Sequence, residues 1–191
     1  MGFPYSEVSM AAKTKRAPFK GYIQVYTGDG KGKTTAALGL ALRAAGRGLK
    51  TYIGQFLKGR VYGELMAVRK LSPFIKIERF GRTGFIHVTD DPDVEDIRRA
   101  RRGLAKCRAA MLSGCFDIVV CDEINIALDF KLLSEAEVLA FLDEKPEDVE
   151  IILTGRRAPA AVLRRADLVT EMKEVKHYFK KGVVARPGIE D

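Results

Sequence analysis

Nine consecutive residues decide the fold of this chain: Thr27-Gly28-Asp29-Gly30-Lys31-Gly32-Lys33-Thr34-Thr35. They follow a run of β-branched and aromatic residues at 21–26 and lead into a nearly all-apolar stretch at 33–47, which predicts a strand, a turn and a helix packed on a sheet. A glycine-rich turn in that position is typical of a phosphate-binding P-loop. Its glycines permit the backbone N–H groups to point inward, Lys33 adds a cation for phosphate oxygens, and the Thr34 hydroxyl can bind Mg²⁺.

The spacing of this loop departs from the usual pattern at one position. The pattern G-x-x-x-x-G-K-[ST] would place its first glycine at residue 27, which is Thr27, so that Gly28 comes one residue late. We interpret the stretch as a variant phosphate-binding loop. A plain connection between a strand and a helix is the alternative that the pattern leaves open.

A second motif carries two acids to the end of a predicted buried strand, Ile118-Val119-Val120-Cys121-Asp122-Glu123. This is the Walker B position, where a carboxylate shares one Mg²⁺ with the hydroxyl of the P-loop threonine. Asp122, Glu123 and Thr34 are therefore the candidate metal-binding residues. An ordinary pair of acids at a strand end is the alternative interpretation.

The rest of the chain alternates between short apolar runs and longer helical stretches, which is the rhythm of βαβ units. Further strands are expected at 51–57, 74–80, 117–123, 149–155 and 168–172, and further helices at 63–71, 90–113, from Ser134 onward and at 159–166. We expect the long helix to start at Asp90-Asp91-Pro92, with Pro92 in its first turn. The predicted fold is a single α/β domain over residues 21–191, with a mainly parallel sheet of five or six strands and helices on both faces, in the RecA-like P-loop NTPase class. Residues 1–20 are expected to form a flexible leader.

Composition narrows the chemistry. The formal net charge of +8 favours a polyanionic partner, while two His and three Cys without a CxxC pattern argue against a disulfide framework, a structural zinc site or an iron–sulfur centre. No apolar run has the length of a membrane span and no secretory signal is evident, so we expect a cytoplasmic protein. Local motifs for a Ser/His/Asp or Cys/His nucleophile are missing as well, which leaves reactions that need positioning and charge stabilisation.

A basic run on one predicted helix offers a different function. Six cations share one side of the helix at 90–113: Arg98, Arg99, Arg101, Arg102, Lys106 and Arg108. These cations indicate an alternative function, that of a RecA-like ATPase that binds nucleic acid through this face. More often such a run is a solvated helix surface. A regulatory module that binds a nucleotide without turnover is a third possibility.

Several segments occur in one order that resembles the ATP:corrinoid adenosyltransferases of the CobA/BtuR type. They are residues 28–37 (GDGKGKTTAA), 122–125 (DEIN), 153–156 (LTGR), 166–172 (ADLVTEM), 176–179 (KHYF) and 182–190 (GVVARPGIE). The resemblance implies that the cobalt of a corrinoid reduced to Co(I) attacks the 5′ carbon of ATP and expels triphosphate. Because that nucleophile carries no proton, no general base is required.

The resemblance also implies site residues. Lys33, Thr34 and Glu123 would be catalytic, Thr34 and Glu123 would bind Mg²⁺ with support from Asp122, and the remaining nucleotide contacts would come from Gly28, Asp29, Gly30, Lys31, Gly32, Thr35, Lys58, Asn125 and Arg156. Arg156 is equally well explained as a surface residue that follows a strand.

Two further residues are implied for the corrinoid. Phe85 matches a family segment whose aromatic side chains crowd the lower face of the corrin, and His87 stands where the family has tryptophan. His87 could crowd that face, ligate cobalt, or be an ordinary histidine. The resemblance further implies a homodimer and a flavodoxin-type reductant, and it leaves open whether the corrinoid is complete or a precursor.

Overall fold

The computed structural model describes residues 20–59, 63–82 and 92–190 of the chain. The predicted flexible leader at residues 1–20, apart from Lys20, and the candidate corrinoid residues Phe85 and His87 lie outside the described residues. Over the described ranges, no helix combines the length and the apolar character that crossing a bilayer requires.

A six-stranded, entirely parallel sheet forms the centre of the molecule, with the strand order β3-β2-β4-β5-β1-β6. Its strands are β1 (Ile23–Thr27), β2 (Thr51–Gln55), β3 (Ile75–Arg79), β4 (Ile118–Asp122), β5 (Glu150–Thr154) and β6 (Leu168–Glu171). All six coincide with predicted strands to within a few residues. The sheet confirms the expected fold class.

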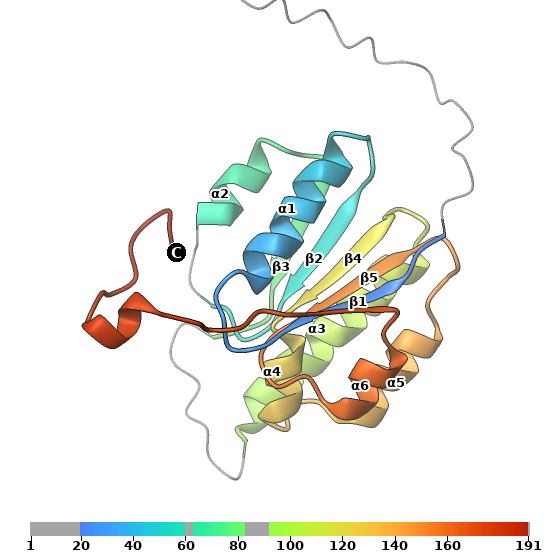
Figure 1. Ribbon diagram of the computed structural model, residues 1–191. Coiled ribbons are helices and arrows are strands. Elements are labelled where there is room, and N and C mark those ends of the chain that lie inside the picture. Colours follow the sequence, from blue (N-terminus) through green and yellow to red (C-terminus); the bar gives the residue numbers. More distant parts are fainter. Residues whose placement is uncertain (1–19, 60–62, 83–91, 191) are drawn as a thin grey trace, which may run out of the picture.

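Helices cover both faces of this sheet (Figure 1). Helices α1 (Lys33–Ala45) and α2 (Gly63–Arg69) lie on one face, and α3 (Val94–Leu112), α4 (Ile124–Asp129), α5 (Glu135–Asp143) and α6 (Ala160–Arg165) lie on the other. A short 3₁₀ helix, η1 (Tyr178–Lys181), follows β6. The two layers define two apolar cores, one on each side of the sheet.

The core beneath α1 shows why this segment is a helix of small residues. Ala37, Ala41 and Ala44 are spaced along one face of the helix, are almost fully buried and pack on Val120 and Ile152 of the sheet. Small side chains on this face let the helix axis approach the sheet closely. The start of α1, which carries Lys33, is thereby fixed at the carboxyl end of β1.

The observed start of α5 agrees with the prediction from the sequence, and that of α3 does not. Helix α5 begins at its N-cap Ser134, as expected, with a capping box in which Ser134 and Glu137 satisfy each other's backbone N–H groups. The expectation that α3 starts at residue 90 with Pro92 in its first turn is wrong. The carboxylate of Asp93 accepts a hydrogen bond from the Glu95 N–H and makes Asp93 the N-cap, so Pro92 lies before the helix.

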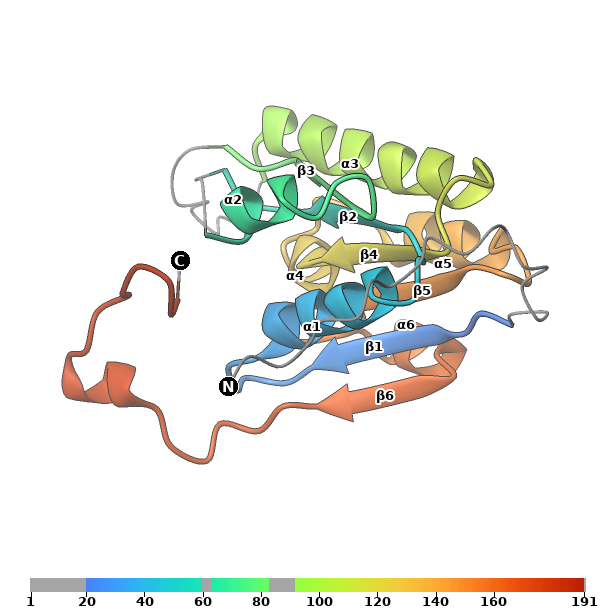
Figure 2. The ribbon, with the colours of Figure 1, turned by 90° about the horizontal axis from the view of Figure 1, so that it is seen from above.

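The parallel strands all end at one edge of the sheet, and the residues of the two sequence motifs meet there. Figure 2 shows the arrowheads of β1, β4 and β6 pointing to the same side, where the segment that follows β6 extends outward and returns toward α2. In open α/β sheets, ligands bind at this edge.

Candidate functional site

A cavity of about 720 Å³ opens at the carboxyl edge of the sheet, between the P-loop (residues 27–35), the start of α2 and the segment after β6. Nine of the predicted nucleotide or metal residues contribute to its wall: Gly30, Lys31, Gly32, Lys33, Thr34, Thr35, Lys58, Glu123 and Arg156. The structure thus brings together residues that are up to 126 positions apart in the chain (30 to 156). The volume is in the range of small-ligand sites.

Lys33 is held inside the curve of the P-loop. Its Nζ donates hydrogen bonds to the backbone oxygens of Gly28, at 2.7 Å, and Gly30, at 2.8 Å, and the residue is only 7% exposed. Burial lowers the pKa of this ammonium, while the charge of Glu123 acts in the opposite direction. The loop therefore positions a poorly hydrated cation at the cavity, where an anionic ligand would stabilise it.

Asp122, at the end of β4, is the centre of the polar network. Its Oδ1 accepts hydrogen bonds from the hydroxyls of Thr34, at 2.8 Å, and Thr154, at 2.7 Å. Its Oδ2 accepts one from Lys58 Nζ at 2.8 Å and a longer one from Gln55 Nε2 at 3.3 Å. Because Asp122 is 1% exposed, this carboxylate acts from behind the cavity wall and orients Thr34 and Lys58.

Glu123 follows directly and lines the cavity. Its backbone is left-handed, with φ 66°, and its N–H donates to the Thr154 hydroxyl at 2.9 Å, so β4 ends in a sharp turn into α4. Burial and the neighbouring charge of Asp122 raise the pKa of the Glu123 carboxyl. A carboxylate in this environment is stabilised by a cation.

Hydroxyl and carboxylate oxygens are the ligands that Mg²⁺ prefers, and the cavity presents both from Thr34 and Glu123. The donor set therefore fits this ion. Within the described residues, no cluster of three or more His, Cys, Asp or Glu side chains is suited to a metal, so a bound ion would complete its coordination with water and ligand phosphates.

Other predicted residues are placed differently. Asn125 is fully buried, and its Nδ2 donates to the Gly155 backbone oxygen at 3.2 Å, so the structure does not bring it to the cavity wall. Asp29 is 73% exposed, its Oδ1 lies 3.9 Å from Arg156 Nε, and it is not among the residues that line the cavity. Arg156 lines the cavity and is half exposed.

The sequence analysis missed several residues of this site. Thr154 ends the strand next to β4, and its position in a predicted parallel sheet was the available signal. Gln55 ends β2 in the same way and also donates to Glu64 Oε1 at 2.9 Å. His177, Ile189 and Glu190 reach the cavity from the segment after β6.

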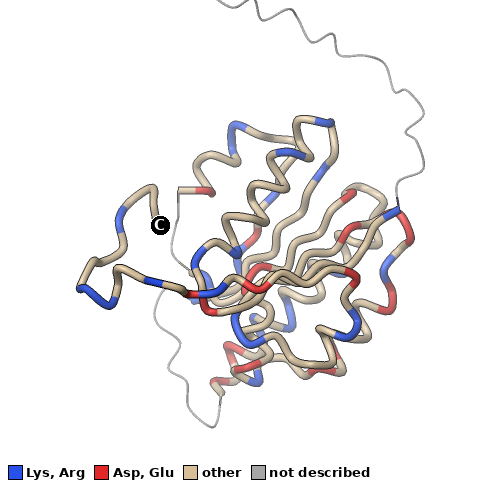
Figure 3. The backbone as a smooth tube through the Cα atoms, in the orientation of Figure 1, with Lys and Arg blue, Asp and Glu red and all other residues tan. Residues whose placement is uncertain are grey.

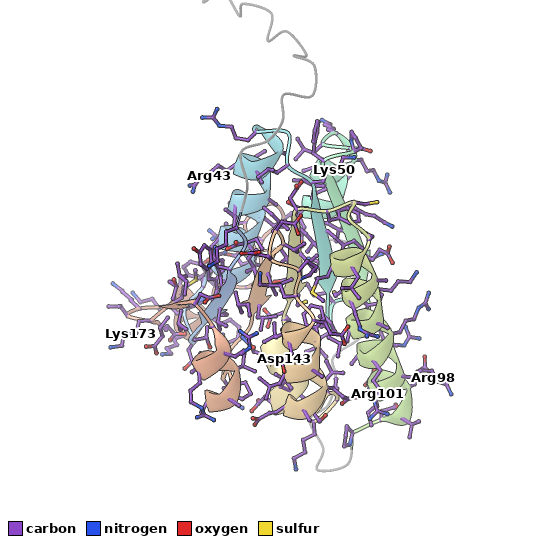
Figure 4. The ribbon with its side chains drawn as sticks, turned by 90° about the vertical axis from the view of Figure 1, so that its right-hand side faces the viewer. Arg43, Lys50, Arg98, Arg101, Asp143 and Lys173 are labelled. Carbon is purple, nitrogen blue, oxygen red and sulfur yellow. The ribbon has the colours of Figure 1, made fainter. Side chains whose placement is uncertain are left out.

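Four of the six cations in the basic run on α3 pair with acids. Arg101 pairs with Glu137 of α5 at 2.8 Å, Arg108 pairs with Glu144 at 2.5 Å, and Arg98 and Arg99 both lie near Glu95. Figure 3 shows acidic residues beside basic ones along the lower helices, and Figure 4 shows Arg101 on the side of α3 that faces α5. The arrangement is typical of a solvated helix surface and does not favour the nucleic-acid alternative.

Comparison with known proteins gives a consistent result. A family model described as ATP:corrinoid adenosyltransferase BtuR/CobO/CobP matches residues 19–190. The chain is 37% identical to a corrinoid adenosyltransferase of Sinorhizobium, over 96% of this chain and 85% of that protein. It is 36% identical to the corrinoid adenosyltransferases of Pseudomonas aeruginosa and Escherichia coli K12, over 90% of this chain and 84% and 86% of those proteins.

Solved structures with the same fold are more distant. A KaiC-like protein of Pyrococcus horikoshii has a TM-score of 0.54 and 18% identity, over 82% of this chain and 74% of that one. The RadB recombinase has a TM-score of 0.53 and 16% identity, over 83% and 77%. These likenesses confirm a P-loop NTPase-like fold.

Proposed function

Because the chain belongs to the BtuR/CobO/CobP family of ATP:corrinoid adenosyltransferases, we propose that its P-loop holds the triphosphate of ATP during transfer of the adenosyl group to a reduced corrinoid. The protein is a transferase that uses ATP and a corrinoid as substrates. The observation that carries the assignment of the site is the convergence of Lys33, Thr34 and Glu123 on one cavity above Asp122.

The reaction makes one bond and breaks one. An electron pair of Co(I) forms the cobalt–carbon bond to the 5′ carbon, and the bond from that carbon to the triphosphate oxygen breaks with its electrons on the leaving group. No proton has to be removed from the nucleophile. The protein's task is therefore to orient the ribose carbon and to stabilise the polyanion that departs.

The residues of the cavity suit that task. Lys33 would move its hydrogen bonds from the Gly28 and Gly30 carbonyls to phosphate oxygens, and Arg156 and Lys58 would add positive charge at the cavity wall. Asp122 would keep the Thr34 hydroxyl and the Lys58 ammonium in place throughout. This division gives Lys33 direct contact with the leaving group and Asp122 a supporting role.

Thr34 and Glu123 would hold Mg²⁺, with Asp122 behind them. When bound, the ion would neutralise part of the charge that the triphosphate carries. Two observations support this Mg²⁺ site: Thr34 and Glu123 offer oxygen ligands, and the pKa of the Glu123 carboxyl is raised.

Several family-based expectations stay predictions. They are contacts of Phe85 and His87 with the corrinoid, a homodimer, a flavodoxin-type reductant and a cytoplasmic location.

The function is tested by incubating the protein without oxygen with MgATP and a chemically reduced corrinoid. We expect inorganic triphosphate and a light-sensitive adenosylated corrinoid in equal amounts. Release of single phosphate without an adenosylated product would instead indicate an ATPase. ATP binding with no product of either kind would indicate a nucleotide-binding module.

A further inference from the structure

The segment after β6, residues 172–190, crosses the P-loop in direct contact with its backbone. The Gly30 N–H donates to the Met172 backbone oxygen at 2.6 Å. A Cβ atom at Gly28 or Gly30 would lie 2.5 or 2.7 Å from that same oxygen, closer than a carbon side chain can approach. These two glycines therefore make room for the segment, in addition to any contact with phosphate.

The segment then turns through η1 and returns to the loop at Lys31. The Lys31 ammonium donates to Glu190 Oε1 at 2.7 Å, to the Ile189 backbone oxygen at 2.9 Å and to the Tyr178 hydroxyl at 3.4 Å. An ammonium group has three hydrogens to donate, so these contacts use its whole capacity. In this structure Lys31 is bound to the segment and Lys33 is the loop cation that faces inward.

Glu190 is the acceptor around which this contact is built. Its Oε2 accepts hydrogen bonds from the Arg186 backbone N–H at 2.9 Å and from Arg186 Nε at 3.2 Å, and its Oε1 also accepts one from the Tyr178 hydroxyl. The Arg186 guanidinium lies 5.0 Å from the centre of the Tyr178 ring. Hydrogen bonds from Arg186 and then Lys31 hold the pKa of the Glu190 carboxyl well below its usual range.

The anchored residues form part of the cavity. His177, Gly188, Ile189 and Glu190 line the same cavity as Lys33 and Thr34. Figures 1 and 2 both show the segment running outward from β6 and coming back beside the start of α2. The contact at Lys31 therefore attaches this wall to the P-loop at a second point, beyond the hydrogen bond between Gly30 and Met172.

We propose that the ion pair of Lys31 and Glu190 anchors residues 177–190 as one wall of the ATP cavity, and that Glu190 is a positioning residue for ATP. Lys31 serves this anchor and leaves phosphate binding to Lys33. The inference rests on the proposed placement of the triphosphate at Lys33.

The test uses the full chain in four variants: Glu190→Ala, Lys31→Met, the double variant and Glu174→Ala. Glu174 is the matched control, because it pairs with Lys180 inside the same segment and its loss changes the net charge equally. The rate of deuterium exchange in residues 173–190, measured without ligand, shows whether the segment is held against the P-loop. Calorimetric titration with MgATP and the KM and kcat of adenosyl transfer report its effect on the nucleotide.

We expect Glu190→Ala and Lys31→Met each to speed exchange of the segment and to weaken ATP binding by about 3- to 10-fold. The double variant should lose less affinity than the product of the two single effects, because both substitutions remove the Lys31–Glu190 contact. KM for ATP should rise in parallel while kcat at saturating ATP stays near the wild-type value. Glu174→Ala should leave ATP binding unchanged.

If Lys31 instead binds phosphate directly, Glu190→Ala should change the ATP affinity in the opposite direction. Removing the Glu190 carboxylate would then relieve repulsion and tighten ATP binding. Tighter ATP binding by Glu190→Ala would overturn the proposal, and so would an unchanged rate of deuterium exchange in that variant. It would also be overturned if the segment exchanged faster while ATP affinity stayed the same, or if the losses of ATP affinity in the two single variants multiplied in the double variant. A Lys33→Ala variant that binds ATP normally would instead refute the placement of the triphosphate and leave the exchange result to judge the anchor.

Discussion

The hydroxyl of Thr34 lies 2.8 Å from the carboxylate of Asp122, and this hydrogen bond joins the start of α1 to the end of β4. Since Lys58 Nζ lies 2.8 Å from the other oxygen of the same carboxylate, the loop, the sheet and the residues after β2 are linked through one buried side chain. Such a network holds its polar groups in place before the ligand arrives.

Asp122→Asn should damage this network while preserving its shape. The amide is neutral and has only one oxygen to accept hydrogen bonds, so it cannot replace both carboxylate oxygens, and the Lys58 ammonium loses the negative charge of its ion pair. We expect a loss of about 1–3 kcal/mol in the free energy of unfolding and a fall of at least ~10-fold in triphosphate release. Urea unfolding and a triphosphate assay measure the two effects. Asp117→Asn, just before the same strand, is the control, and turnover should not change in it. Normal turnover in Asp122→Asn would contradict the role given to this carboxylate.

Glu123→Gln should change the dependence on magnesium. The amide removes the negative charge that faces the cavity, so we expect the Mg²⁺ concentration for half-maximal turnover to rise by about 10-fold or more. A titration of activity with MgCl₂ at fixed ATP measures the shift, and chelation of Mg²⁺ should abolish turnover of the wild type. Glu147→Gln, which lies before β5 at the other edge of the sheet, should titrate like the wild type. Equal Mg²⁺ dependence in both variants would exclude Glu123 as a ligand.

Two glycine substitutions should act in opposite directions. Gly30→Ala would drive its methyl group to 2.7 Å from the Met172 backbone oxygen, so the loop or the segment after β6 must move. We expect a lower melting temperature and weaker ATP binding. Gly39 lies within α1, where an added Cβ meets nothing within 4 Å. Gly39→Ala should therefore raise the free energy of unfolding by about 0.5–1 kcal/mol. Thermal unfolding of the two variants measures both effects. Equal shifts of the melting temperature in Gly30→Ala and Gly39→Ala would show that the close contact at Gly30 is not present.

Glu137→Gln tests the capping box of α5 through its pH dependence. The hydrogen bond from the Ser134 backbone N–H lowers the pKa of Glu137 in the folded protein. A carboxyl whose pKa is lowered by folding contributes stability above its unfolded pKa, and this contribution is lost as the pH falls through the folded value. We expect the variant to be about 0.5–2 kcal/mol less stable at pH 7. The difference should narrow below about pH 4, where the unfolded wild-type carboxyl is protonated. Urea unfolding at both pH values measures it. If the difference in the free energy of unfolding were the same at both pH values, the charge of Glu137 would not be involved. Glu135→Gln, in the same turn, is the control.

Much of the fold follows from local sequence patterns. The apolar runs that became β4 and β5 are buried along their whole length, and the glycine-rich loop lies between the strand and the helix that it predicted. Lys33, Thr34 and Glu123 could be placed together because the carboxyl ends of parallel strands share one edge. Helix α4 was not predicted because its residues 124–129 are few, mostly apolar and directly follow a strand.

The C-terminal wall of the site could not be predicted in this way. Lys31 and Glu190 are separated by 159 positions, and neither residue type at its position indicates the other. Their contact depends on the path of the segment after β6, which local propensity does not encode. Asn125 shows the reverse case, since a residue from a recognised motif is buried behind the site and bonded to Gly155.

In the proposed reaction, Lys33 stabilises the departing triphosphate. The most direct test of this role is single-turnover release of triphosphate by Lys33→Ala, with MgATP and a reduced corrinoid under anaerobic conditions. Lys76→Ala, a substitution at an exposed lysine of β3 that pairs with Glu78, is the control. We predict that Lys33→Ala loses triphosphate release and adenosylated product together by about 10²-fold or more, while Lys76→Ala keeps wild-type rates. Normal release of triphosphate by Lys33→Ala would contradict the account.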